Sequence, residues 1–293
     1  MSEAKADPTF LTLEQVASFR DDGFLVLEGF ASPDACLELR EHALEVAAAN
    51  VPDPRTATIF TADGEQRHAT DEYFLESGDQ IRCFFERDAF DANGHLTGPA
   101  HLVLNKLGHA MHDLDPVFDR FSRTPELAAV AHDIGFAEPR LLQSMYIFKQ
   151  ARIGGEVGCH TDHTFLWTDP RSCVGFWFAI DDATTENGCM WALPGGHRIP
   201  VKQRFHRVGD GSRAEMEVFD PAPYPTENLV PLEAPRGTLI LLDGQLPHLS
   251  GPNNSDKPRH AYTLHVIDGT ADYPGDNWLQ RDASLPLKGF ANA

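Results

Sequence analysis

The sequence has few basic residues for its length. Its 293 residues include 24 lysines and arginines against 44 aspartates and glutamates, which gives a formal net charge of −20 at pH 7. A surface with this balance repels phosphate backbones and anionic lipid headgroups. We therefore expect neither a nucleic acid nor a membrane among the partners of this chain.

Long apolar runs and a cysteine framework are also lacking. No run approaches the roughly 18 apolar residues of a membrane span, and the first residues, MSEAKADPTF, have neither the basic nor the apolar region of a signal peptide. The five cysteines are scattered and form no Cys-x-x-Cys pair, which argues against a disulfide framework and a zinc ribbon. These features predict a cytoplasmic protein in a reducing compartment, and we expect a monomer.

Three common catalytic signatures are missing as well. The chain has no Gly-x-Ser-x-Gly, no phosphate-binding loop and no Gly-x-Gly-x-x-Gly. Serine hydrolases, nucleotide triphosphatases and dinucleotide-dependent enzymes therefore lack their anchor residues here.

Helix signals are concentrated in the first half of the chain. Thr12 and Gln15 form a capping box before a helix that Gly23 ends, and Ser32 with Pro33 begins a second helix. Helical periodicity returns over residues 102–123 and 125–135. We expect residues 1–138 to form a helical support.

Strand signals dominate from Pro139 onward. Short apolar runs alternate with Gly, Pro, Asp and Asn, a pattern typical of a two-sheet β structure. The runs are LLQSMYIFKQ, VGFWFAID, MWALPGG, GTLILLDG and HAYTLHVI. We predict one domain over 1–293, mainly β with flanking helices (α+β), with a double-stranded β-helix or jelly-roll core over 139–270.

A polar stretch over residues 198–230 interrupts the strands. Loops of this length are often lids or flexible insertions, so we expect a lid-like insertion. Its basic part, residues 201–213, could receive an anionic group, but we interpret it as a solvated loop.

A metal site is indicated by three residues. Side chains two apart on a strand point to the same face, so His160 and Asp162 would form a metal clamp, and His248 ends a later strand run. Two imidazoles and one carboxylate leave three positions open on an octahedral ion, which suits ferrous iron that binds a cosubstrate and dioxygen. Arg259, eleven residues after His248, could pair with a carboxylate in such a site.

Together these residues resemble the His-x-Asp, distal His and Arg pattern of iron(II)- and 2-oxoglutarate-dependent oxygenases, specifically the phytanoyl-CoA dioxygenase family. Three segments carry the likeness further, and it covers nearly the whole chain. FRDDGFLVLEGF is similar to the family's helix-to-strand opening, GGEVGCHTDHTFL to its metal loop, and TENGCMWALPGGHR to its Glu-Asn-Gly turn and the segment that follows.

The resemblance implies a double-stranded β-helix, iron held by His160, Asp162 and His248, and 2-oxoglutarate held by Arg259. It further implies a cosubstrate pocket with four more residues, Lys106, Met145, Trp177 and Ser250. The activity implied is decarboxylation of 2-oxoglutarate to succinate and carbon dioxide with hydroxylation of a small or medium organic substrate, for which Phe84, Phe85 and Trp191 are candidate cavity walls.

Other readings of the same residues remain. A non-enzymatic metal-binding jelly roll that senses a small ligand would have no need of Arg259, and a halogenase would need a small residue in place of Asp162. A zinc hydrolase with the same three ligands stays open. We interpret His109 and His112 as a pair on a helix surface, and His163 as a solvated side chain or one behind the ligands.

Overall fold

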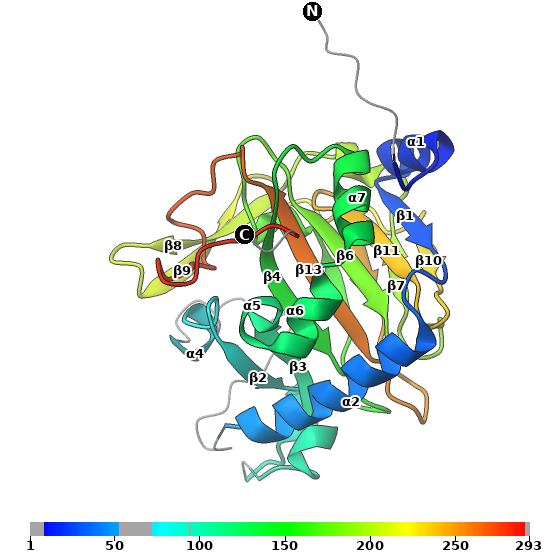
Figure 1. The fold of residues 1–293 in the computed structure, drawn as a ribbon. Helices are drawn as coiled ribbons and strands as arrows, with labels where there is room; N and C mark the ends of the chain where they lie inside the picture. Colours follow the sequence, from blue (N-terminus) through cyan, green and yellow to red (C-terminus); the bar gives the residue numbers. More distant parts are fainter. Residues whose placement is uncertain (1–8, 53–71, 94, 291–293) are drawn as a thin grey trace, which may run out of the picture.

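Two antiparallel sheets form the centre of the computed structural model, which describes residues 9–52, 72–93 and 95–290 (Figure 1). The smaller sheet has the order β10 (Val230–Leu232), β7 (Met190–Ala192), β12 (His248–Ser250), β5 (Val157–His160). The larger sheet has the order β1 (Phe24–Leu27), β11 (Leu239–Asp243), β6 (Val174–Ala179), β13 (Ala261–Asp268), β4 (Pro139–Ile147), β3 (Leu104–His109), β2 (Ile81–Phe85).

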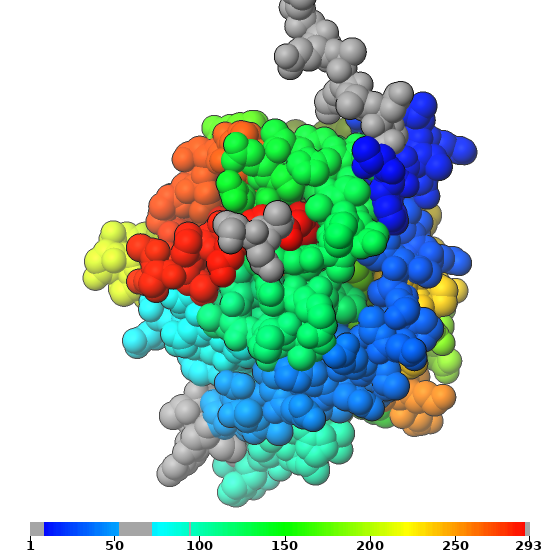
Figure 2. Space-filling model, in the orientation of Figure 1, coloured from blue at the N-terminus to red at the C-terminus, as the bar shows by residue number. Residues whose placement is uncertain are grey.

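Helices cover the outer face of the larger sheet. In Figure 1, α2 (Pro33–Asn50), α6 (Pro116–Ser122) and α7 (Pro125–Ile134) lie over its strands, and the space-filling view shows their side chains closing this face (Figure 2). The short helices α4 (Glu72–Leu75) and α5 (Met111–Leu114) lie near β2 and β3, and α1 (Leu13–Asp22) precedes β1. The predicted jelly-roll core with flanking helices is confirmed.

Strand β13 shows how the two faces of the larger sheet differ. Tyr262 and Leu264 pack into the core beneath the helices, while Ala261 packs with residues of the smaller sheet. Because side chains alternate along a strand, Thr263 and His265 also point between the sheets, where they line a cavity. The strand is buried on both faces. One face packs under the helices, and the other lines a cavity between the sheets.

The capping signals place the first two helices correctly. The Thr12 side chain accepts a hydrogen bond from the backbone of Gln15, whose side chain accepts one from the Thr12 backbone, and Gly23 adopts a left-handed conformation with φ 80° at the end of α1. Ser32 caps α2 in the same way, by accepting from the backbone N–H of Ala35.

The helix predicted over residues 102–123 is wrong in its first part. Residues 104–109 form β3, which pairs with β2 on one side and β4 on the other. Nearly all of its side chains are buried, so the strand lacks the alternation that identifies a half-exposed strand. The helical part is divided as well, because Asp115 caps a new helix that begins at Pro116.

The stretch predicted as a lid-like loop contains a regular hairpin. Strands β8 (Gln203–Val208) and β9 (Arg213–Val218) pair with each other and are joined around Asp210 and Gly211. An Asp-Gly pair between short alternating runs is a hairpin signal, which the charge of this stretch obscured. Phe205 and Ala214 pack into a core cluster with Trp278, so this hairpin is anchored to the C-terminal segment.

Within the part of the chain that the structure describes, no helix is both long and apolar enough to cross a membrane. The five cysteines are all free.

Candidate metal and cosubstrate site

Three side chains, two on strands of the smaller sheet and one just after a strand, converge on one point. Nε2 of His160 lies 3.8 Å and Nε2 of His248 3.7 Å from Oδ1 of Asp162, and one ligand atom of each residue lies within 4.8 Å of the others. Strand β12 pairs with β5 so that His248 is directly opposite His160, which explains the convergence of residues far apart in sequence. Among the residues that the structure describes, these three form the one group of His, Cys, Asp and Glu side chains placed to share a metal ion.

Both imidazoles are oriented by their own backbone. Nδ1 of His160 lies 2.8 Å from the carbonyl oxygen of Gly158, and Nδ1 of His248 lies 2.9 Å from that of Leu246. A ring that donates from Nδ1 leaves the Nε2 lone pair free for a metal. Burial, and then the neighbouring His248, lower the pKa of His160 to about 4, so this ring is neutral at physiological pH.

The prediction that His160 and Asp162 share a strand is wrong in detail. Strand β5 ends at His160, and Asp162 begins a short 3₁₀ turn (Asp162–Thr164). Thr161 between them keeps an extended backbone, with φ −123° and ψ 139°. The two side chains therefore still point the same way, although the chain turns immediately afterwards.

The carboxylate of Asp162 is held from its far side by residues of the larger sheet. Nε2 of His265 lies 3.3 Å from Oδ2, and Gly175 leaves room for this oxygen, since a Cβ there would lie 3.2 Å from it. Burial alone would raise the pKa of Asp162, but the nearby His265 and His248 outweigh it and lower the pKa. The aspartate is therefore ionised and oriented.

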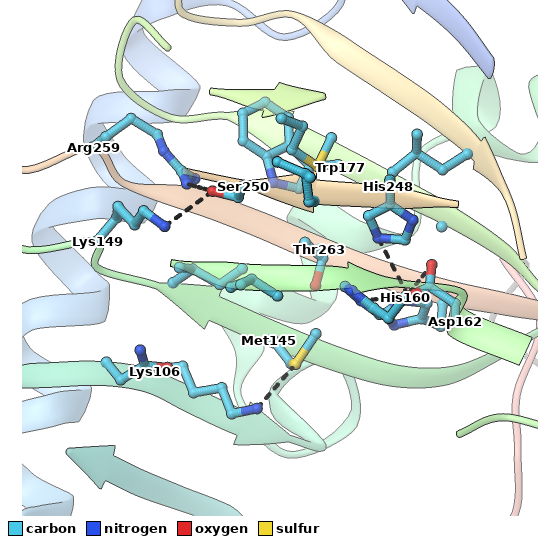
Figure 3. A pocket seen from close by; sticks show the side chains of 18 of the residues that line it. Lys106, Met145, Lys149, His160, Asp162, Trp177, His248, Ser250, Arg259 and Thr263 are labelled. Atoms are coloured by element: carbon cyan, nitrogen blue, oxygen red, sulfur yellow. Dashed lines mark hydrogen bonds and ion pairs between the residues drawn. The ribbon is translucent and has the colours of Figure 1, made fainter. Parts of the chain in front are cut away.

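The other end of the same cavity is cationic (Figure 3). Arg259 is buried, and its Nη2 donates to the carbonyl of Gly188 at 3.0 Å and to Oγ of Ser250 at 3.3 Å. The guanidinium lies over the ring of Trp177, 5.4 Å from its centroid. Burial lowers the pKa of Arg259 to about 10, so it remains charged at neutral pH.

Arg259 also has unused hydrogen-bonding capacity. Its Nε and Nη1 are buried and have no hydrogen-bond partner among the residues that the structure describes. A buried donor without a partner is unfavourable by about 1–3 kcal/mol, and more when the group is charged. Unpaired donors on a buried guanidinium are suited to an anionic acceptor such as a carboxylate.

The remaining predicted residues line the same cavity. Met145 is on β4, and Lys106 is on β3 rather than on the predicted helix, with its Nζ 3.7 Å from Sδ of Met145. Burial lowers the pKa of Lys106 to about 7. The structure thus brings all eight predicted site residues to one cavity, His160, Asp162, His248, Arg259, Ser250, Trp177, Met145 and Lys106.

The cavity residues that the sequence analysis did not identify include three of interest for the site, namely Lys149, Thr263 and His265. Two of them had a signal, because a period of two counted from Arg259 places Thr263 and His265 on the same face of one strand. Lys149 had none, since its position depends on a left-handed backbone, with φ 38°. The sequence analysis also named Phe84, Phe85 and Trp191 as candidate cavity walls. This prediction is wrong, because none of them lines this cavity.

Three histidines discussed above, His109, His112 and His163, do not line the cavity. His109 and His112 are fully buried, so their interpretation as a helix-surface pair is wrong. Their Nδ1 atoms lie 2.7 Å from Oγ of Ser77 and 2.9 Å from Oγ of Ser144, respectively. His163 is buried rather than solvated, because the chain turns inward after Asp162.

Comparison with known proteins agrees with this geometry. The sequence model of the phytanoyl-CoA dioxygenase (PhyH) family matches residues 19–261. The chain belongs to the phytanoyl-CoA dioxygenase family. A phytanoyl-CoA dioxygenase of Arabidopsis thaliana is 43% identical over 279 residues, which cover 94% of this chain and 95% of the relative. Phytanoyl-CoA dioxygenase domain-containing protein 1 of Mus musculus is 41% identical over 284 residues, covering 94% of this chain and 97% of the relative.

Solved structures share the fold of this phytanoyl-CoA dioxygenase family member at lower identity. The non-heme alpha ketoglutarate dependent carbocyclase SnoK of nogalamycin biosynthesis aligns with a TM-score of 0.65 and 19% identity over 96% of this chain and 99% of that chain. EctD from S. alaskensis, in its apoform, aligns with a TM-score of 0.63 and 20% identity over 100% of this chain and 88% of that chain. The prediction of the family, and with it of an oxygenase, is confirmed.

Proposed function

We propose that the protein is an iron(II)- and 2-oxoglutarate-dependent dioxygenase that hydroxylates a small or medium organic substrate. The observation that carries this proposal is one cavity with a His-Asp-His group at one end and a buried, incompletely paired arginine at the other (Figure 3). Family membership supports an oxygenase, and solved structures of similar fold include an epimerase, SnoN, in complex with Fe3+ and alpha ketoglutarate.

The first end of the cavity fits a ferrous ion. His160 and His248 would each offer Nε2 and Asp162 would offer Oδ1, a neutral-nitrogen and carboxylate set that suits iron and leaves positions for other ligands. No cysteine belongs to the group, which disfavours the closed, thiolate-rich arrangement of a structural zinc site.

The second end fits the distal carboxylate of 2-oxoglutarate. Arg259 would donate from one of its unpaired nitrogens to this carboxylate, close to the Ser250 hydroxyl. Trp177 and Met145 would enclose the aliphatic part. A small-ligand sensor gives no reason for a guanidinium whose buried donors lack partners.

Ferrous iron in this site would supply the redox chemistry by which dioxygen, the oxidant, oxidises both reactants: 2-oxoglutarate would become succinate and carbon dioxide, and one C–H bond would become C–OH. The protein residues hold and orient the reactants. His160, Asp162 and His248 would hold the ion, while Arg259 would anchor the cosubstrate. The buried aromatic and aliphatic lining of the cavity excludes water from the reacting groups.

The substrate is proposed to be a small or medium organic molecule without several phosphates. The basic residues of the hairpin are engaged within the protein. Lys202 pairs with Asp220, Arg204 with Asp276, and Arg207 donates to backbone carbonyls. These cations therefore do not form a free patch for a polyanionic group, in keeping with the overall negative charge.

Succinate formation tests the proposal. Purified protein with ferrous iron, 2-oxoglutarate and oxygen should release succinate, detected by NMR, and a metabolite extract that contains the substrate should accelerate the release. Asp162→Ala should abolish it, because the ion loses its carboxylate ligand. Asp88→Ala, a change at an exposed aspartate, is the control and should leave it unchanged. Absence of succinate from the wild-type protein under all these conditions would refute the proposed function.

Two further expectations stay predictions. A cytoplasmic, reducing location fits the five free cysteines, and a monomer is expected because the site is assembled within a single chain.

A further inference from the structure

A second cation, Lys149, lies beside Arg259 at the same end of the cavity (Figure 3). Its Nζ donates to Oγ of Ser250 at 3.0 Å and to the carbonyl oxygen of Gly155 at 2.6 Å. The Ser250 hydroxyl is therefore shared between a lysine and an arginine, both only 2% exposed. Lys149 is thus a second positive group beside Arg259, and the family resemblance did not point to it.

Neither cation has an ion-pair partner within the described ranges of the chain. Glu86 acts electrostatically on Lys149, but its Oε2 accepts from the backbone N–H of Gly155 at 3.3 Å. Burial raises the pKa of this glutamate, which weakens it as a counter-ion. Adjacent buried like charges are strongly unfavourable unless an anion compensates them, so this end of the cavity is complementary to an anion.

The fold fixes Lys149 in this position. Its backbone is in the left-handed region, with φ 38°, and its carbonyl accepts from the backbone N–H of Arg259 at 3.1 Å and from Nδ2 of Asn253 at 2.9 Å. Gly188 gives the lysine stem its space, since a Cβ there would lie 2.7 Å from Cε of Lys149. An unfavourable backbone conformation persists only where the surroundings determine it, and such positions cluster at ligand sites.

We propose that Lys149 and Arg259 together bind the distal carboxylate of the cosubstrate, with the Ser250 hydroxyl between them, and that Lys149 thereby selects dicarboxylic over monocarboxylic 2-oxo acids. The inference rests on the proposed function and deepens it. Lys149 would donate to one carboxylate oxygen, while an unpaired nitrogen of Arg259 would donate to the same group. If Lys149 served only to brace Gly155, its removal would affect all 2-oxo acids alike.

Ligand selectivity separates these two roles. Dissociation constants for 2-oxoglutarate and 2-oxopentanoate, in which a methyl group replaces the distal carboxylate, are to be measured by calorimetry on Mn(II)-loaded protein without oxygen. For Lys149→Met we expect the affinity for 2-oxoglutarate to fall about 10- to 100-fold, the range of a lost charge-assisted hydrogen bond. The affinity for 2-oxopentanoate should stay within about twofold, which also reports that the variant is folded.

A second variant distinguishes charge from bracing. Lys149→Gln can still donate to Gly155 and Ser250 but carries no charge, so it should lose selectivity as Lys149→Met does. Recovery of wild-type selectivity in this variant, or an equal loss for both ligands in either variant, would overturn the inference. Lys257→Met, a change at an exposed lysine two residues before Arg259, is the matched control and should change neither constant.

The same titrations keep the two proposals apart. If wild-type protein fails to bind 2-oxoglutarate, the proposed function fails and the inference fails with it. If wild-type protein binds 2-oxoglutarate but both Lys149 variants retain its selectivity, the function stands and only the role of Lys149 is refuted.

Discussion

Nε2 of His265 contacts Oδ2 of Asp162 at 3.3 Å, while Oδ1 of the same carboxylate faces His160 and His248. A residue of the larger sheet thus orients a carboxylate that follows the end of a strand of the smaller one. Loss of such a contact to a ligand typically lowers metal affinity by about 10- to 100-fold.

His265→Ala should therefore lower the affinity for ferrous iron by about 10- to 100-fold, because the carboxylate loses its orienting donor. Competition with a coloured chelator under anaerobic conditions measures this. His95→Ala, a change at an exposed histidine, provides the comparison. Equal iron affinity in all three proteins would show that His265 does not orient the carboxylate.

Gly175→Ala tests the space on the same side of Asp162. The added Cβ would lie 3.2 Å from Oδ2, so the carboxylate must move by a few tenths of an ångström. We expect iron affinity to fall several-fold with little change in the thermal unfolding temperature, since the backbone at this position suits any residue. Gly275→Ala adds a methyl group that meets nothing within 4 Å and serves as the control. A Gly175→Ala protein that binds iron as tightly as the wild type would contradict this account.

Arg259→Met should weaken 2-oxoglutarate binding by about 2–5 kcal/mol, the usual range for truncating one partner of a buried charge pair. Arg259→Lys should recover only part of the loss, because an ammonium lacks the planar fork that binds both oxygens of a carboxylate. Calorimetry on Mn(II)-loaded protein measures both variants. Metal affinity is the internal control and should not change, and a variant that keeps full affinity for 2-oxoglutarate would remove Arg259 from the site.

The binding of 2-oxoglutarate should weaken as pH rises. Burial, and for Lys149 also the adjacent Arg259, lower the pKa of Lys149 and of Lys106 to about 7. Both lysines attract a carboxylate when protonated, below this pKa, and lose that charge above it. Arg259, with a pKa of about 10, stays charged, while Glu86 and Glu156 near Lys149 oppose its deprotonation.

Calorimetric titrations from pH 6 to pH 9 check this dependence. The dissociation constant should rise by up to about tenfold per pH unit above 7 if one proton is coupled to binding. The constant for 2-oxopentanoate should rise less if the coupled lysine contacts the distal carboxylate. A constant for 2-oxoglutarate that does not change over this range would contradict the prediction.

The sequence predicts the helices well where the signal is local. Thr12, Gln15 and Gly23 act within a few residues of one another, so their capping geometry follows from their order in the chain. Strand β3 was missed because both of its faces are buried, and a buried strand resembles a buried helix in its pattern of apolar residues. Its neighbours β2 and β4 decide its conformation, and no local pattern contains them.

The candidate site divides in the same way. His160 and Asp162 are close in sequence, and His248 and Arg259 could be found from their places beside strand runs. Lys149 could not be found, because its side chain reaches the cavity only through an uncommon backbone conformation and the space left by Gly188. Residues whose positions depend on such distant contacts require the structure.

Strand β5 is an edge strand that pairs only with β12 in the smaller sheet, and its register is irregular between His248 and Ser250. An ion shared by His160 and His248 would join these two strands through their side chains, in addition to a short ladder of backbone hydrogen bonds. Local opening of β5 would then be coupled to metal release. The rate at which the amide protons of β5 exchange with solvent would therefore report how tightly the ion is bound.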